Sequence, residues 1–236
     1  MEKTNFMPGE IPSTFEEVLY WRITQKTWRI IVMNILAITL TGVIGLGFLL
    51  LVLIVSGPSV IKFCSSTQFS VTLLVSLLLV FPLHELIHGL AMKIFDAKPK
   101  YGFIWKGLMF YATAPGHAFK RNQYLVIALA PLVSVTILAA LSVLILANYP
   151  IVWILALCAT INGGGAIGDL WICAIVFRFP PHAYVIDERD GMRIFLPKNS
   201  AELKWSKQKM WKCAQPSINL TRLRLEQTGA IFRLSI

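Results

Sequence analysis

Charged residues are scarce in this 236-residue chain, and the scarcity is the first indication of its class. Only 14% of the residues are charged, whereas 56% are hydrophobic and the mean hydropathy is +0.66. A soluble domain averages about 25% charged and about 45–50% apolar residues. The composition therefore excludes an ordinary soluble domain and indicates a membrane protein.

Cysteine is also scarce, and its spacing excludes further classes. The four cysteines form no CxxC pair, which argues against a disulfide scaffold. Cys158 and Cys173 lie in apolar runs, where we expect small buried side chains rather than metal or redox ligands. The first 29 residues lack the apolar core and cleavage site of a secretory signal, so we expect the first apolar run to remain in the mature protein.

Basic residues outnumber acidic ones by 22 to 12, but they form no contiguous basic face for nucleic acid. They lie almost wholly between apolar runs, as they do where Lys and Arg orient a chain in a bilayer. The connection 93–123 is the most basic, and Arg178 follows the last run, whereas 56–69 contains Lys62 alone. We therefore expect a multi-pass cell-membrane protein with both termini cytoplasmic.

Four apolar runs are long enough for the roughly 20 residues that a membrane helix needs. They predict an all-α polytopic membrane protein with about four transmembrane helices, at approximately 31–55, 70–94, 124–146 and 151–177. The corresponding division of the chain is a cytoplasmic N-terminal segment, a transmembrane core and a cytoplasmic C-terminal tail, at 1–29, 30–177 and 178–236.

Two segments outside the spans have strand-like patterns. The C-terminal tail contains two strand-like segments, 183–187 and 192–196, with Gly191 at the turn between them. This pattern predicts a small hairpin. The connection 93–123 contains aromatic residues between turn signals, and we expect a hairpin or loop at the membrane surface. Beyond about residue 198 the sequence pattern is weak and indicates no role for the tail.

The second apolar run contains the motif HExxH as His84, Glu85 and His88. The i, i+4 spacing places both imidazoles on one helix face, where they can bind a single Zn²⁺, and Glu85 projects beside the metal. There a carboxylate can activate zinc-bound water for attack on a peptide carbonyl. The alternatives are a buried hydrogen-bond network and a helix that ends early at the interface.

Asp169 is the one ionisable residue of the fourth run and the candidate third ligand. It lies 9 residues before Arg178, while His84 and His88 lie 9 and 5 residues before Lys93, so all three fall in the same layer of the membrane. The alternative is an Asp that pairs with another span or lines a water-filled cavity. His117 is the rival third ligand, and His182 is expected to be structural or solvated.

Asn162 and a group of glycines interrupt the fourth run, where a plain helix would avoid them. Irregular backbone at membrane depth is tolerated where it lines a cavity, such as a peptide-binding cleft beside a metal. Close packing of small residues against another helix explains the glycines equally well. Both interpretations remain open at this point.

The segments His84–Gly89, Leu129–Leu132, Asn162 and Gly168–Asp169 together resemble the site-2-protease-like intramembrane zincins, and most closely a zincin peptidase family of small multi-span bacterial membrane proteins. The resemblance covers about residues 70–175. It implies that His84, His88 and Asp169 bind zinc, that Glu85 is the base, and that Asn162 helps to hold the substrate backbone. The chain departs from the site-2 pattern in having Gly-Asp-Leu instead of Asp-Gly, and no proline-rich stretch after Asn162.

The sequence thus predicts an intramembrane zinc metallopeptidase that hydrolyses a peptide bond near the cytoplasmic face, with zinc-bound water activated by Glu85. Its expected partners are a membrane-associated peptide or protein substrate and the lipid bilayer. One alternative is a non-catalytic membrane metalloprotein that binds a client protein, and another is an ion or metal transporter. Retention of Glu85 favours the enzyme, because a structural zinc site needs no base beside it.

Overall fold

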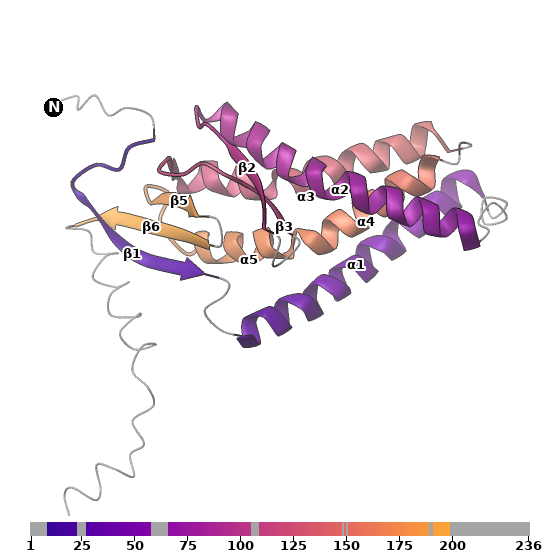
Figure 1. Cartoon of the computed structure of the whole chain (residues 1–236), viewed down its shortest axis with the longest axis horizontal. Helices are drawn as coiled ribbons and strands as arrows, with labels where there is room; N and C mark the ends of the chain where they lie inside the picture. The colour runs from indigo at the N-terminus through magenta and orange to yellow at the C-terminus, as the bar shows by residue number, and fades with distance from the viewer. Residues whose placement is uncertain are drawn as a thin grey trace, which may run out of the picture.

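The computed structural model contains five helices and six strands in the part of the chain that it describes (Figure 1). The described residues are 9–22, 27–57, 66–104, 109–147, 149, 151–188 and 191–198. The predicted tail beyond residue 198 lies outside them.

Five helices form the larger part of the structure: α1 (Thr27–Ser56), α2 (Ser66–Ile94), α3 (Arg121–Ile145), α4 (Ile151–Gly165) and α5 (Ile167–Val176). The first three are each long and apolar enough to cross a membrane, and α4 with α5 forms a fourth candidate span. A helix satisfies its backbone hydrogen bonds internally, and it needs to do so because the hydrocarbon core of a membrane offers no hydrogen-bond partners. The prediction of about four apolar spans therefore agrees with the helices of the structure.

The fourth span is broken rather than straight. The axes of α4 and α5 differ by 44° at a break around Ala166. The break follows three consecutive glycines at 163–165, which have little helix propensity. Asn162 precedes the break and Asp169 follows it, and both contact His84 of α2.

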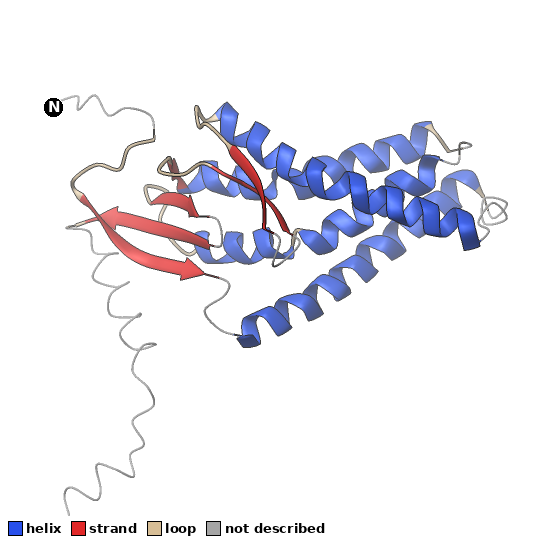
Figure 2. Ribbon diagram, in the orientation of Figure 1, coloured by secondary structure: helices blue, strands red, loops and turns tan. Residues whose placement is uncertain are grey.

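Strands gather at one end of the helices (Figure 2). A four-stranded antiparallel sheet has the order β1-β6-β5-β4, with bounds Phe15–Arg22, Gly191–Pro197, Tyr184–Glu188 and Ala118–Lys120. A separate hairpin, β2 (Lys100–Ile104) with β3 (Met109–Thr113), contacts α2. The β5–β6 hairpin and the hairpin within the connection 93–123 are both confirmed.

The all-α class is confirmed only in part, because the described residues are mostly helical but also form two sheets. The largest omission was β1, which lies in the predicted N-terminal segment and pairs with β6 from Phe15↔Pro197 to Arg22↔Gly191. Val18 and Trp21 of β1 are buried, at 3% and 6% exposed. The strand is therefore fixed by burial against a partner more than 160 residues away in the sequence, which no local pattern reveals.

Two apolar clusters hold these elements together. One joins the inner face of the four-stranded sheet to the adjoining ends of α2, α3 and α5, and includes Met92, Phe119, Tyr124, Val185 and Ile194. The other lies between α1, α3 and α4 at the opposite end of the bundle. The sheet is thus packed directly onto the helix ends near His88 of α2 and Asp169 of α5.

Glycines of α4 allow α1 to approach closely. A Cβ on Gly163 would meet the side chain of Ile44, and one on Gly164 would meet the Thr41 hydroxyl and lie 3.3 Å from the Ala37 carbonyl oxygen. Gly165 and Gly168 line cavities, and Gly164 also lines the larger of them. Close packing therefore accounts for Gly163, cavity lining accounts for Gly165 and Gly168, and Gly164 does both.

We expect Gly164→Leu to lower the apparent Tm of the detergent-purified protein, because overpacking costs about 1–3 kcal/mol and the backbone of α1 blocks the new side chain. Gly47→Leu is the matched control, since it adds the same side chain to α1 where a Cβ meets nothing within 4 Å. Equal Tm shifts in the two variants would contradict close packing at Gly164.

Candidate metal centre

The helix α2 presents both motif histidines on one face, one turn apart. The ring centroids of His84 and His88 are 4.8 Å apart and nearly perpendicular, and their Nε2 atoms are separated by 3.2 Å. Both side chains are largely buried, at 12% and 10% exposed. The two Nε2 atoms therefore converge on one point beside the helix.

Asp169 reaches the same point from α5. Its Oδ2 lies 3.1 Å from Nε2 of His84 and 3.5 Å from Nε2 of His88. The potential ligand atoms of the three residues all lie within 4.8 Å of one another, and they form the one such group of three or more among the described residues. The position of Asp169 thus agrees with the prediction that it lies in the same layer as the two histidines of α2.

The hydrogen bonds of the two imidazoles fit a metal ion at this point. His88 Nδ1 lies 2.9 Å from the carbonyl oxygen of Ile127, and His84 Nδ1 lies 2.9 Å from Oδ1 of Asn162. Because these oxygens can only accept, each Nδ1 donates an N–H, which leaves each Nε2 as the nitrogen that can bind a metal. Two imidazole nitrogens and a carboxylate oxygen are a typical ligand set for catalytic zinc, which leaves a fourth position for water.

Glu85 lies between the two histidines in the sequence and is held beside them by the β2–β3 hairpin. Its carboxylate accepts a hydrogen bond from the backbone N–H of Ala112 in β3. Gly89 contributes to this arrangement, because a Cβ there would meet the Tyr101 hydroxyl of β2. The hairpin therefore packs on α2 one residue past the motif and fixes the orientation of the carboxylate.

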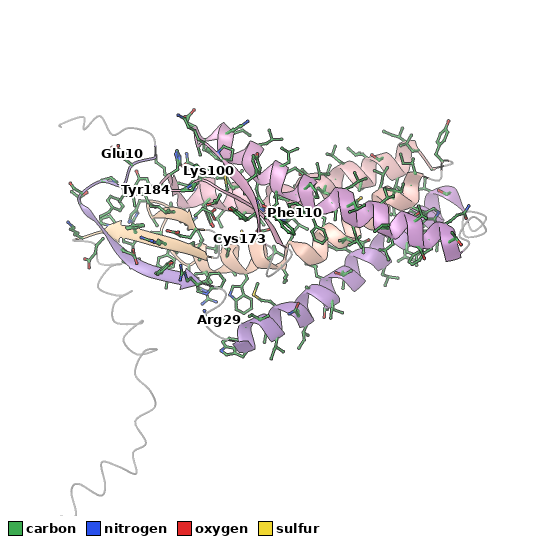
Figure 3. All side chains as sticks on the ribbon, in the orientation of Figure 1. Glu10, Arg29, Lys100, Phe110, Cys173 and Tyr184 are labelled. Carbon is green, nitrogen blue, oxygen red and sulfur yellow. The ribbon has the colours of Figure 1, made fainter. Side chains whose placement is uncertain are left out.

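Two neighbouring cavities lie at the centre. One, of about 220 Å³, is bounded by the metal-centre residues, β3 and the facing ends of β5 and β6 at Glu188 and Gly191. The other, of about 560 Å³, lies between the N-terminal half of α1 and α2 with α4, and its wall is mainly apolar. Both are lined by His84, Glu85 and Phe110. Figure 3 labels Phe110 on β3 and Cys173 on α5, the two elements that flank the first cavity.

Comparison with known families bears on this centre directly. Residues 77–184 match a family model described as "Putative zincin peptidase". The matched range contains all three converging residues and Glu85, so it supports a zinc peptidase family and zinc as the metal. Neither a curated protein nor a solved structure matches the chain.

The remaining sequence-predicted residues lie in other positions. His117 packs its ring 4.6 Å from that of Phe119, outside the cluster, and partial burial lowers its pKa. His182 is exposed, and Cys158 and Cys173 are buried free thiols.

Asn162 is only 2% exposed and touches the centre through His84. Its Nδ2 donates to the carbonyl oxygen of Pro131 at 3.1 Å, while its Oδ1 accepts from His84. Both ends of the amide are therefore engaged within the protein. Its expected role in holding the substrate backbone stays a prediction.

Two further polar residues at the first cavity escaped sequence reasoning. The Tyr124 hydroxyl donates to Oδ1 of Asp187 at 2.8 Å, and both side chains line the cavity. Burial raises the pKa of Asp187 to about 6, with Asp169 adding to the rise. Asp187 lies in the predicted hairpin, but only the packing of that hairpin on α3 shows that it faces the centre. The sequence carried no signal for this pairing.

The raised pKa of Asp187 predicts a pH-dependent stability. Well below pH 4 the carboxyl is protonated in both states and costs nothing, whereas well above pH 6 the folded state bears the full cost of the buried charge, up to about 3 kcal/mol. We therefore expect Asp187→Asn to raise the apparent Tm at pH 8 and to leave it nearly unchanged at pH 4. Glu10→Gln, at an exposed carboxylate, is the control. A gain that is equal at both pH values would contradict the buried charge.

Proposed function

We propose that this chain is an intramembrane zinc metalloendopeptidase of the site-2-protease-like kind, which hydrolyses a peptide bond near the cytoplasmic face of the membrane. The observation that carries the proposal is the convergence of His84 Nε2, His88 Nε2 and Asp169 Oδ2 beside Glu85. The match to a zinc peptidase family over residues 77–184 supports it.

Zinc bound by His84, His88 and Asp169 would polarise the substrate carbonyl and acidify the attacking water. Glu85 is the base that accepts a proton from this water as its oxygen bonds to the carbonyl carbon. The same carboxyl then donates the proton to the amide nitrogen, so that the C–N bond breaks and a free amine leaves. The Ala112 N–H holds Glu85 in place for both transfers.

The strand β3 offers a support for an extended peptide. It pairs with β2 along one edge, and the Ala112 N–H points from the other edge toward Glu85. Successive residues of a strand alternate in direction, so the backbone of Phe110 has the same orientation as that of Ala112. A substrate strand beside this edge would have its backbone next to the metal centre.

The apolar cavity supports a substrate that arrives within the membrane. Figure 1 shows α1 diverging from the other helices toward its N-terminal end. The cavity lies in this gap, with Ile30, Ala37, Val80 and Phe81 in its wall and the metal-centre residues at its end. An apolar peptide segment could therefore reach the catalytic residues laterally, without crossing the sheet.

Charge distribution supports the proposed orientation. Lys93 and Arg121 lie at the helix ends that meet the four-stranded sheet, and Lys100 begins β2. If these residues face the cytoplasm, the sheet does so as well. His88 lies five residues before Lys93, about 8 Å along the helix, so the reaction takes place just inside that membrane face.

The test of this function is Glu85→Gln, which keeps the shape of the side chain and removes the base. We expect cleavage of fluorescently labelled β-casein by the detergent-purified protein to fall at least about 100-fold. Bound zinc, measured by mass spectrometry, should stay the same, because Glu85 is not a ligand. Glu10→Gln, at an exposed carboxylate, serves as the control.

Unchanged cleavage by Glu85→Gln would contradict the assigned role of Glu85. A zinc-loaded, unaltered protein that cleaves neither β-casein nor a quenched apolar peptide would instead favour the client-binding alternative.

A further inference from the structure

Both motif histidines are oriented by hydrogen bonds that end at backbone carbonyls of α3, and Pro131 is involved in both. Pro131 lies in the middle of this helix, and its side chain is buried. Proline has no backbone N–H, so it cannot donate to the carbonyl of the residue four positions earlier. In α3 that residue is Ile127, whose carbonyl oxygen is therefore left without its helical partner at residue 131.

The freed carbonyl of Ile127 is used by His88. Its oxygen accepts the Nδ1–H of His88 at 2.9 Å, at a residue that is only 2% exposed. A buried carbonyl without a partner would cost free energy. The His88 N–H removes this cost, because it replaces the backbone N–H that Pro131 lacks. This bond fixes the tautomer of His88 and aims its Nε2 at the metal centre.

The carbonyl of Pro131 itself serves His84 through Asn162. It accepts a hydrogen bond from Nδ2 of Asn162 at 3.1 Å, so the Oδ1 end of this amide points away from Pro131. Oδ1 of Asn162 therefore faces His84 and accepts its Nδ1–H at 2.9 Å. Two carbonyls of α3, one helical turn apart, thus orient the two histidines of α2.

We propose that Pro131 is a positioning residue for the metal centre, which sets the tautomers and ring orientations of His88 and His84 through the carbonyls of residues 127 and 131. The inference rests on the proposed function in taking the histidines as metal ligands. The tautomers themselves can be measured without metal or activity. A proline that only bends or packs α3 would affect stability but not these tautomers.

Replacing Pro131 by alanine changes this arrangement in a defined way. The new N–H at residue 131 would compete with His88 for the Ile127 carbonyl, as in any α-helix. Loss of a hydrogen bond that orients a metal ligand typically weakens metal binding by about 10–100-fold. Alanine favours the helix, so we expect Pro131→Ala to fold.

The experiment compares Pro131→Ala with Pro82→Ala in detergent. Pro82 also lies inside a spanning helix, α2, but its side chain is exposed. In the described part of the chain, the Leu78 carbonyl that it frees accepts no side-chain hydrogen bond. Zinc dissociation constants come from competition with a chelator, and imidazole tautomers from ¹⁵N NMR of the metal-free, ¹⁵N-histidine-labelled protein.

We expect Pro131→Ala to weaken zinc binding about 10–100-fold and to shift the Nδ1–H signal of His88, while Pro82→Ala stays within about twofold. An ester linkage at position 131, made with the α-hydroxy analogue of alanine, removes the N–H without restoring the ring. It should recover most of the zinc affinity. Unchanged zinc affinity in Pro131→Ala, or an ester variant that behaves like Pro131→Ala, would overturn the proposal.

Two further results keep the inference separate from the proposed function. If Pro131→Ala does not fold, Asn162→Leu tests the His84 branch, and zinc affinity equal to that of the unaltered protein would overturn that branch. If the unaltered protein binds no zinc, the proposed function fails, but the ¹⁵N tautomer signals still decide whether Pro131 orients the histidines.

Discussion

The contact between Asp169 and the two histidines of α2 is the constraint on which the rest of the site depends. Oδ2 lies 3.1 Å and 3.5 Å from the two Nε2 atoms, so α2 and α5 must meet at one depth with polar atoms facing each other. Polar and ionisable groups inside a membrane are costly unless they pair or bind an ion. One metal ion would satisfy all three ligand atoms at once, which accounts for their presence in otherwise apolar helices.

The other elements position further polar side chains and two cavities around this contact. The break between α4 and α5 separates Asn162, which bonds His84, from Asp169, which faces both histidines. The β2–β3 hairpin holds Glu85, and the four-stranded sheet covers the helix ends while contributing Asp187 to the cavity. Because α1 diverges from the bundle on the remaining side (Figure 1), a second, larger cavity shares His84, Glu85 and Phe110 with the first.

Local patterns predicted much of this structure, and long-range pairings account for what they missed. Apolar runs indicated the spans, the HExxH spacing indicated the shared helix face, and counting residues to the basic flanks matched Asp169 with α2. No local signal could indicate that β1 pairs with β6, or that Tyr124 meets Asp187, because both depend on how distant segments pack. The proline in α3 was visible in the sequence, but its use required knowing which imidazole meets the carbonyl of Ile127.

X-ray absorption at the zinc K-edge tests the central claim most directly, because it reports the atoms around the metal in the unaltered, detergent-purified protein. The account predicts about one zinc per chain, with two imidazole nitrogens at about 2.0 Å, one or two further oxygens and no sulfur. A protein that takes up no zinc, or a zinc shell that contains sulfur or four imidazoles, would contradict the assignment of His84, His88 and Asp169 as the metal centre.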